Sequence, residues 1–146
     1  MARRDEIAWV NDSQSTIPDA AIAALHAFPA PVTLIAGGRT KLENEDAYDG
    51  LARAVQEAGA RLILIGEAAP RLLRAATRAG VKDSQIFDAK TLLEAVRLAK
   101  MLATPGETVV LSPACASFDQ FTSYEHRGEV FRQAVREVCG LIDNPV

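Results

Sequence analysis

The chain has 146 residues, of which 49% are hydrophobic and 24% charged, and its formal net charge is −3. This length suits one domain with one core, and the slight acidity gives no electrostatic reason to expect nucleic acid or anionic lipid as a partner. The sequence shows neither an apolar run long enough to span a bilayer nor a signal-peptide pattern, which predicts a cytoplasmic protein that does not enter the membrane.

Short apolar or β-branched runs alternate with segments of helical period along the chain. The expected strands are 7–10, 32–36, 61–66, 84–88 and 108–112. Pro18 and Pro70 are placed to open helices, Gly59 and Gly80 to end them, and Thr91 begins a capping box. The pattern therefore predicts five βα units.

Five βα units predict a three-layer, Rossmann-like α/β fold, with a mainly parallel five-stranded sheet and helices on both faces. We expect residues 6–140 to form this domain, residues 1–5 to be a disordered or residual tail, and residues 141–146 to be a flexible C-terminal tail. Ligands of such sheets bind beyond the carboxyl ends of the strands, so function is sought in the loops that follow them.

Three of these loops differ from ordinary turns. They are NDSQST (11–16), GGRTK (37–41) and SPACAS (112–117). Gly37 and Gly38 allow the backbone to approach a ligand closely, and Lys41 supplies a cation at the same edge. Ser117, at an expected helix start, would offer a hydroxyl beside free backbone amides. Together the loops predict a site for a carboxylate or a phosphate.

Each of these residues also has a purely structural interpretation. Thr16, Ser117 or Asp119 could simply cap a helix, and Lys41 could be a solvated surface lysine. Asp12 and Ser13 could have no other role than to shape an Asx-type turn. The individual signals are weak, and only their combination favours a binding site.

The sequence offers no metal site and no nucleophile with an adjacent base. Cys115 and Cys139 lie in separate elements without metal-ligand spacing, and His26 and His126 are isolated. The paired glycines fit neither the dinucleotide fingerprint nor the P-loop pattern. Nucleotide binding by this chain alone is therefore not predicted.

Taken in order, the motifs resemble those of a known family. The stretches W-V-N-D-S-Q-S-T, L-I-A-G-G-x-x-K and V-V-L-S-P-A-C-A-S-F-D-Q-F-x-x-Y-E-x-R-G-x-x-F look like the C-terminal domain of the Mur ligases, specifically of their D-glutamate-adding members. The likeness covers about residues 6–139. It implies the third domain of an ATP-dependent ligase of peptidoglycan synthesis that adds D-glutamate to UDP-N-acetylmuramoyl-L-alanine.

The resemblance implies a binding role for this domain and no catalytic residue. An acyl phosphate made with ATP would be attacked by D-glutamate, which this domain holds. ATP and Mg²⁺ would be bound mainly by a central domain that this chain lacks, so none is expected to be held tightly here. The isolated domain is accordingly expected to be inactive.

Carried over by motif, the resemblance assigns the two carboxylates of D-glutamate to two groups of residues. Lys41 and Thr16 look like the pair that holds one carboxylate. Ser117, with backbone near Phe118 and Tyr124, looks like the holder of the other. Such charge-assisted hydrogen bonds would orient the amine for attack.

The remaining assigned residues belong to the first two loops. Asp12 matches the family's contact to the ATP ribose across a domain interface, and Asn11, Ser13, Gly37 and Gly38 support the loops.

Two residues depart from the family pattern. Gln14 stands where lysine is common, and Arg39 stands where an acidic residue is common. The first removes a cation on the phosphate side. The second reverses the charge beside the carboxylate site, where it could add to carboxylate binding or alter the pocket.

The family topology places the five strands in the order 1-5-2-3-4, with the first strand at an edge. We expect residues 1–6 to be too short and too charged to cover that edge fully, so that the chain could self-associate through Ile7 to Val10.

Two other functions remain open at this stage. The chain could belong to another Mur-type or folylpolyglutamate-type ligase that adds a different amino acid. It could also be a stand-alone α/β module that binds a carboxylate.

Overall fold

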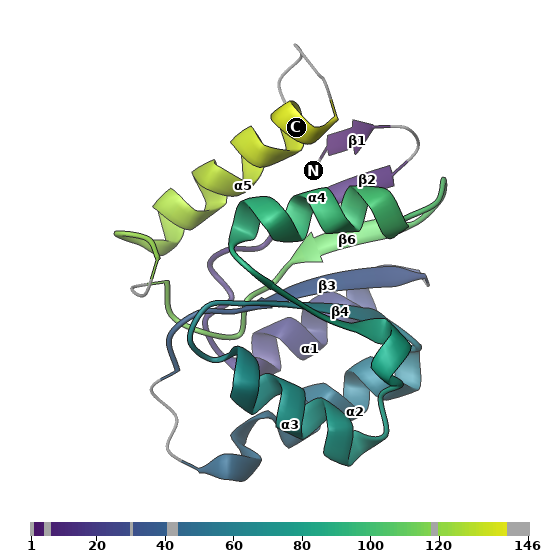
Figure 1. Ribbon diagram of the computed structural model, residues 1–146, viewed down its shortest axis with the longest axis vertical. Coiled ribbons are helices and arrows are strands. Elements are labelled where there is room, and N and C mark those ends of the chain that lie inside the picture. Colours follow the sequence, from purple (N-terminus) through teal and green to yellow (C-terminus); the bar gives the residue numbers. More distant parts are fainter. Residues whose placement is uncertain (1, 5–6, 30, 41–43, 118–119, 140–146) are drawn as a thin grey trace.

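The computed structural model describes residues 2–4, 7–29, 31–40, 44–117 and 120–139, without the side chains of residues 2–4. This part of the chain forms a central sheet with helices on both faces (Figure 1). The strands are β1 (Ala2–Arg4), β2 (Ile7–Asn11), β3 (Val32–Gly37), β4 (Arg61–Ile65), β5 (Ile86–Lys90) and β6 (Thr108–Leu111). The helices are α1 (Pro18–Ala27), α2 (Asp49–Ala58), α3 (Ala69–Ala79), α4 (Leu92–Leu102) and α5 (Tyr124–Val138), with short 3₁₀ turns η1 (Glu45–Tyr48) and η2 (Asp83–Gln85).

The sheet has the strand order β1-β2-β6-β3-β4-β5, and every neighbouring pair except β1 with β2 is parallel. The five parallel strands therefore follow the order 1-5-2-3-4 when numbered among themselves. This confirms the predicted fold class and strand order.

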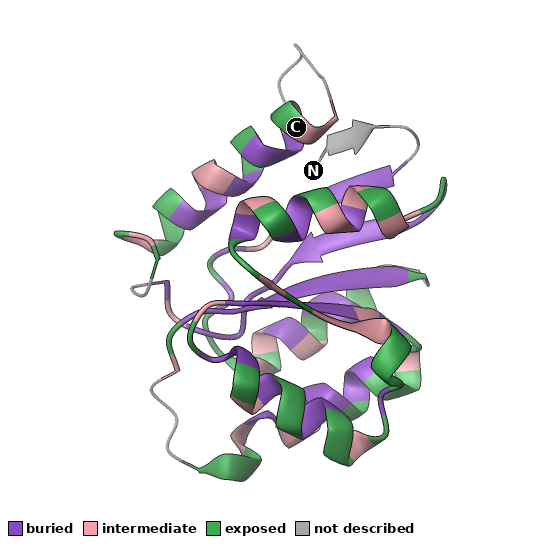
Figure 2. Cartoon of the chain, viewed as in Figure 1, coloured by how far each residue is buried: buried purple, intermediate pink, exposed green. Residues whose placement is uncertain are grey.

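Two apolar cores lie on opposite faces of the sheet because successive side chains of a strand point to opposite faces. Leu34 and Ala36 of β3 pack with α1, α2 and α3, whereas Ile35 packs with α4 and α5. The central strands are buried on both faces, which explains why they read as nearly continuous apolar runs rather than alternating ones (Figure 2).

Helix ends follow the sequence signals closely. Gly59 and Gly80 adopt left-handed backbone angles, with φ of 63° and 85°, at the ends of α2 and α3. Thr91 Oγ1 accepts a hydrogen bond of 3.3 Å from the Glu94 amide, which confirms Thr91 as the N-cap of α4. The expected capping box is only half formed, because the Thr91 amide donates to the Ala89 carbonyl at 2.7 Å and not to the Glu94 side chain. Among the described helices, none is both long enough and apolar enough to cross a membrane.

Residues 2–4, expected to be part of a tail, form a strand. Arg4, Arg3 and Ala2 pair in antiparallel register with Ile7, Ala8 and Trp9, respectively, so β1 covers the outer edge of β2 over those residues. The expectation that residues 1–6 leave this edge open is therefore wrong for Ile7 to Trp9, which removes the stated reason for association over those three residues, whereas Val10 lies beyond the register with β1. Those three residues of β2 therefore have a neighbouring strand on their outer side. Residues 141–146, expected to form a flexible tail, lie outside the described residues.

Candidate functional site

The loop after β6 lies against the loop after β2 at the carboxyl edge of the sheet. The Ala114 amide donates to the Ser15 carbonyl at 2.9 Å, and Ser112 Oγ donates to Asp12 Oδ2 at 3.0 Å. Ser15 Oγ donates to the same Asp12 oxygen at 2.5 Å. Asp12 is thus an acceptor that joins the two loops through hydroxyl groups.

The turn in the N-D-S segment is made by the asparagine and not by the aspartate. Asn11 Oδ1 accepts a hydrogen bond of 3.1 Å from the Ser13 amide, the pattern of an Asx turn. An Asx-type turn was one of the two interpretations of this segment, and it is present, but Asn11 forms it and not Asp12. The Asp12 side chain instead contacts the neighbouring loop.

The loop after β3 joins the same assembly. The Gly37 amide donates to the Pro113 carbonyl at 2.9 Å, and Arg39 and Ala116 exchange two backbone hydrogen bonds, each of 2.9 Å. All three loops singled out from the sequence therefore meet at one edge, with the SPACAS loop in the middle.

The paired glycines are required by close approach of the chain to itself. A Cβ at Gly37 would lie 1.9 Å from the Ile65 carbonyl oxygen, and one at Gly38 would lie 2.3 Å from the Ala116 carbonyl oxygen. Both residues also have φ near +135°, which side chains rarely permit. Their role in the described structure is to let β3 and its loop pack tightly beside β4 and the SPACAS loop.

Ser117 does not lie at a helix start. Its carbonyl accepts a hydrogen bond of 3.0 Å from the Phe121 amide, and α5 begins only at Tyr124. The N-cap of α5 is Ser123, whose Oγ accepts a hydrogen bond of 3.0 Å from the His126 amide. The expected helix-dipole contribution at Ser117 is therefore wrong. Ser117 is instead a buried residue, 2% exposed, next to the Arg39–Ala116 bridge.

The other predicted contacts are distributed around this edge. Thr16 is exposed and is not the N-cap of α1, a position that Ile17 occupies. The Tyr124 side chain is 44% exposed, and its carbonyl accepts a 2.6 Å hydrogen bond from Ser13 Oγ. Lys41 and Phe118 lie outside the described residues, so their proposed contacts stay predictions.

Arg127 was missed as a site-building residue, although it stands in the quoted Y-E-x-R-G motif. It is fully buried, with an exposed fraction of 0%. Its Nε and Nη2 donate to the hydroxyl and carbonyl oxygens of Ser13 at 3.0 and 2.6 Å, and its Nη1 donates to the Cys115 carbonyl at 3.0 Å. One guanidinium therefore ties α5 to two of the three loops.

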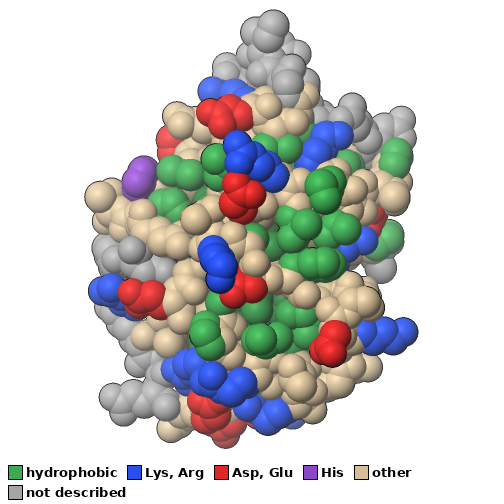
Figure 3. All heavy atoms as spheres, viewed as in Figure 1, with side chains coloured by type: hydrophobic (Ala, Val, Ile, Leu, Met, Phe, Trp, Pro, Cys, Tyr) green, Lys and Arg blue, Asp and Glu red, His purple; other side chains and the backbone are tan. Residues whose placement is uncertain are grey.

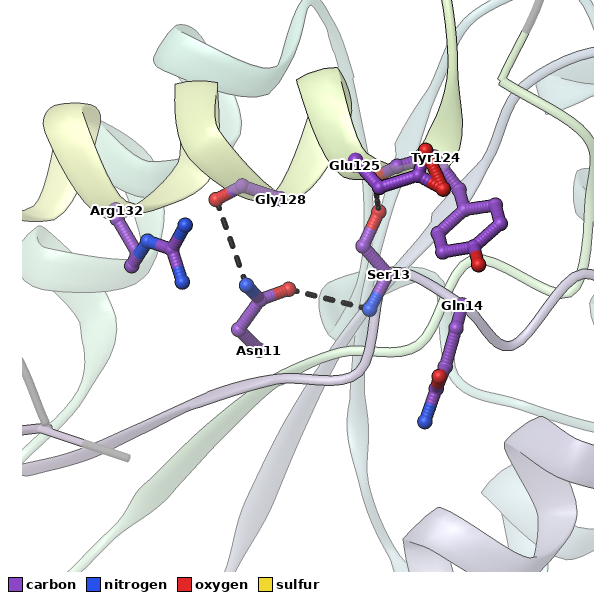
Figure 4. Close-up of a pocket in the computed structure, with 7 residues that line it drawn as sticks. All are labelled: Asn11, Ser13, Gln14, Tyr124, Glu125, Gly128 and Arg132. Atoms are coloured by element: carbon purple, nitrogen blue, oxygen red, sulfur yellow. Dashed lines mark hydrogen bonds between the residues drawn. The ribbon is translucent and has the colours of Figure 1, made fainter.

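The next residue in the motif explains how α5 comes so close. A Cβ at Gly128 would lie 2.9 Å from Asn11 Nδ2, and that amide nitrogen donates to the Gly128 carbonyl at 3.5 Å (Figure 4). A side chain at this position would displace the Asn11 amide, which also holds the N-D-S turn.

A polar cleft of about 330 Å³ opens between that turn and α5 (Figure 4). Its lining comprises Asn11, Ser13, Gln14, Tyr124, Glu125, Gly128 and Arg132. A hydrogen bond to Glu125 raises the pKa of the exposed Tyr124 phenol. Gln14, one of the two departures from the family pattern, contributes an amide to this cleft where a lysine would contribute a positive charge.

Arg39, the other residue that departs from the family pattern, forms an ion pair with a residue of a different loop. Its Nε and Nη2 each donate to a Glu67 carboxylate oxygen at 3.2 Å. Glu67 lies in the loop after β4, which sequence reasoning had treated as an ordinary turn. The reversed charge at position 39 is therefore met by an acidic partner in a neighbouring loop.

These features define a Rossmann-like α/β domain whose candidate site, at the carboxyl ends of the strands, is built from hydroxyl groups, backbone amides and one buried guanidinium. The chain belongs to the Mur ligase family, because the family model described as "Mur ligase, glutamate ligase domain" matches residues 1–115. The resemblance drawn from the motifs is thereby confirmed.

Curated relatives carry one shared description. The proteins from Desulfitobacterium hafniense (strain DSM 10664 / DCB-2) and Symbiobacterium thermophilum are each named "UDP-N-acetylmuramoylalanine--D-glutamate ligase" and are 46% and 45% identical to this chain. The alignments cover 89% and 90% of the chain but only 28% of each relative. The chain thus spans less than a third of the length of these relatives.

A solved structure supports the fold. A domain from Haemophilus ducreyi 35000HP, described as part of a UDP-N-acetylmuramate:L-alanyl-gamma-D-glutamyl-medo-diaminopimelate ligase, superposes with a TM-score of 0.63 over 94% of both chains. At 12% sequence identity, this likeness concerns the fold alone.

Proposed function

We propose that this chain is the amino-acid-binding domain of a cytoplasmic, ATP-dependent ligase that joins D-glutamate to UDP-N-acetylmuramoyl-L-alanine. The observation that carries the proposal is the meeting of three loops at one sheet edge in a chain about 45% identical to relatives named as D-glutamate ligases. The shared name favours D-glutamate over another amino acid.

Each predicted contact has a defined task in this proposal. Lys41 and Thr16 bind one carboxylate of D-glutamate, and Ser117 binds the other with backbone near Phe118 and Tyr124. These groups hold the ligand and leave its amine free to attack. Their contribution is orientation, since none of them needs to exchange a proton with the amine.

The described residues are also compatible with a nucleoside at the domain surface. Asp12 is one of the residues that line a mainly apolar groove of about 550 Å³. The rest of its lining is Val10, Asn11, Gln14, Ser15, Ala20, Ala23, Ala24, Ala27 and Phe28. A carboxylate beside an apolar surface suits a ribose hydroxyl next to a base. ATP, with Mg²⁺, would supply the activation of the carboxylate that accepts the amine.

The test is a titration of the 146-residue chain with D-glutamate and L-glutamate, followed by amide chemical shifts in NMR spectra. We expect D-glutamate to shift amides of the three loops, and Lys41→Ala and Ser117→Ala each to weaken binding by about tenfold or more. Lys82→Ala is the matched control for Lys41→Ala. Lys82 is exposed and precedes β5, so it lies toward the amino ends of the strands and away from the three loops.

Three results would reject the proposal. They are the absence of any shift with D-glutamate at high millimolar concentration, equal shifts with both enantiomers, and unchanged binding in both site variants.

A further inference from the structure

A buried polar cluster lies behind the loops of the candidate site. The Tyr48 side chain, from the 3₁₀ turn η1, is 1% exposed. Its hydroxyl donates to Thr40 Oγ1 at 2.8 Å and lies 3.3 Å from Cys115 Sγ. Thr40 follows the paired-glycine loop and Cys115 stands inside the SPACAS loop, so one hydroxyl group contacts both.

Arg71 of α3 completes the cluster. Its guanidinium carbon lies 5.6 Å from the centre of the Tyr48 ring, a cation–π geometry. Its Nη1 donates to Thr40 Oγ1 at 3.5 Å, and its Nη2 donates to the Asn44 carbonyl at 2.5 Å. Thr40 and Asn44 flank residues 41–43, which lie outside the described residues. Arg71 therefore fixes the chain on both sides of the segment that includes Lys41.

The surrounding charges anchor this cluster to α3. Arg74 and Arg78, one and two turns after Arg71, form ion pairs of 2.6 and 2.7 Å with Glu45 and Asp49. Arginine and acidic side chains accordingly gather over α3 and η1, at the bottom of the space-filling view (Figure 3). Tyr48 stands between the two acidic residues in the sequence, so η1 is held in place while its tyrosine points inward.

The hydroxyl group of Tyr48 is not needed to fill the core. A phenylalanine would occupy nearly the same volume and keep the ring under Arg71, so the hydroxyl adds only its two loop contacts. Burial raises the pKa of the Tyr48 hydroxyl, with the neighbouring Cys115 as a further cause, so the group stays protonated and remains a donor to Thr40.

We propose that Tyr48, supported by Arg71, is a positioning residue that holds the Thr40 end of the glycine loop and the SPACAS loop as one unit. The inference rests on the proposed function, since the two loops lead to Lys41 and Ser117. Tyr48 touches neither carboxylate. It sets the spacing between Thr40 and Cys115, one in each of the two loops.

The first test needs no ligand. Hydrogen exchange of the Arg39 and Ala116 amides, which bridge the two loops, is compared between the wild-type chain and Tyr48→Phe. We expect both amides to exchange about fivefold faster in the variant, while amides within β4 keep their rates. Equal exchange of the two bridge amides in both proteins would overturn the inference.

The second test measures D-glutamate affinity. Tyr48→Phe and Thr40→Val are each expected to weaken binding about fivefold, while Thr40→Ser, which keeps the hydroxyl, is expected to bind as the wild type does. Ile63→Val, a variant in the core on the other face of the sheet, serves as a control for a general loss of stability. An equal loss of affinity in Ile63→Val and Tyr48→Phe would reduce Tyr48 to a structural residue and reject the inference.

The two proposals fail separately. If the wild-type chain does not bind D-glutamate, the proposed function fails, while the exchange of the bridge amides still decides the role of Tyr48. If D-glutamate binds and Tyr48→Phe changes neither exchange nor affinity, only the positioning role fails.

Discussion

Arg127 is the residue on which the described part of the site depends most. Its guanidinium donates hydrogen bonds to three oxygen atoms of the buried residues Ser13 and Cys115. We predict that Arg127→Met lowers the free energy of unfolding by about 3 kcal/mol, because the methionine fills much of the space but leaves those acceptors unpaired. Urea denaturation of the 146-residue chain measures the change.

Arg132, on the same helix, is the natural control. Its side chain is 45% exposed and pairs with Glu129 one turn earlier, so Arg132→Met should change stability little. Similar losses in the two variants would show that Arg127 stabilises the fold no more than a surface arginine does, and would contradict its role in tying α5 to the two loops.

The burial of Arg127 could in part have been predicted. Arg127 stands four residues before Phe131, which is buried, and helical period places both on one face. The surrounding charges, with Glu125 and His126 exposed, favoured a solvated interpretation instead. The hydrogen-bond acceptors over that face come from other parts of the chain, and Ser13 is more than a hundred residues away from Arg127 in the sequence. No local sequence pattern contains that information.

At the scale of elements, the start of α5 is set by a cap that sequence reasoning placed wrongly. Ser123 Oγ accepts a hydrogen bond from the His126 amide and so satisfies one free donor of the first turn. We predict that Ser123→Ala lowers stability by about 1 kcal/mol and that Ser123→Asp retains most of it. Urea denaturation followed by circular dichroism measures both changes.

Thr122→Ala is the companion variant, since Thr122 is exposed and its backbone amide, which the substitution keeps, donates to His126 Nδ1. A loss in Thr122→Ala as large as that in Ser123→Ala would contradict the assigned cap.

The elements show which sequence signals are dependable. The strands were predicted from β-branched and apolar runs, and the ends of two helices from the glycines at positions 59 and 80. These features depend mainly on residues that are neighbours in the chain. The serine-rich stretch from Ser112 to Ser123 offers several residues able to cap a helix, and local preference alone cannot choose among them. The serine that opens α5 is Ser123, and contacts of the helix with distant residues, such as that of Gly128 with Asn11, are not visible in the local sequence.

The whole molecule shows why separate loops can form one site. The strand order places β6 between β2 and β3, so the loop after β6 necessarily lies between the other two at the carboxyl edge. The prediction of that order came from family topology, and the contacts of the SPACAS loop follow from it. Side-chain partners such as Glu67 for Arg39 did not follow, because they depend on loop conformations that strand order leaves free.

The same topology leaves β2 dependent on β1, which alone covers its outer edge in the described structure. We predict that the intact chain is monomeric and that a chain lacking residues 1–4 self-associates, because the backbone groups of Ile7 to Trp9 that β1 had paired become available to another strand. Light scattering over a concentration series measures the difference.

A chain lacking residues 143–146 controls for the loss of four terminal residues, and it should behave as the intact chain does. A monomer at every concentration after removal of residues 1–4 would show that β1 is not what keeps this edge from pairing.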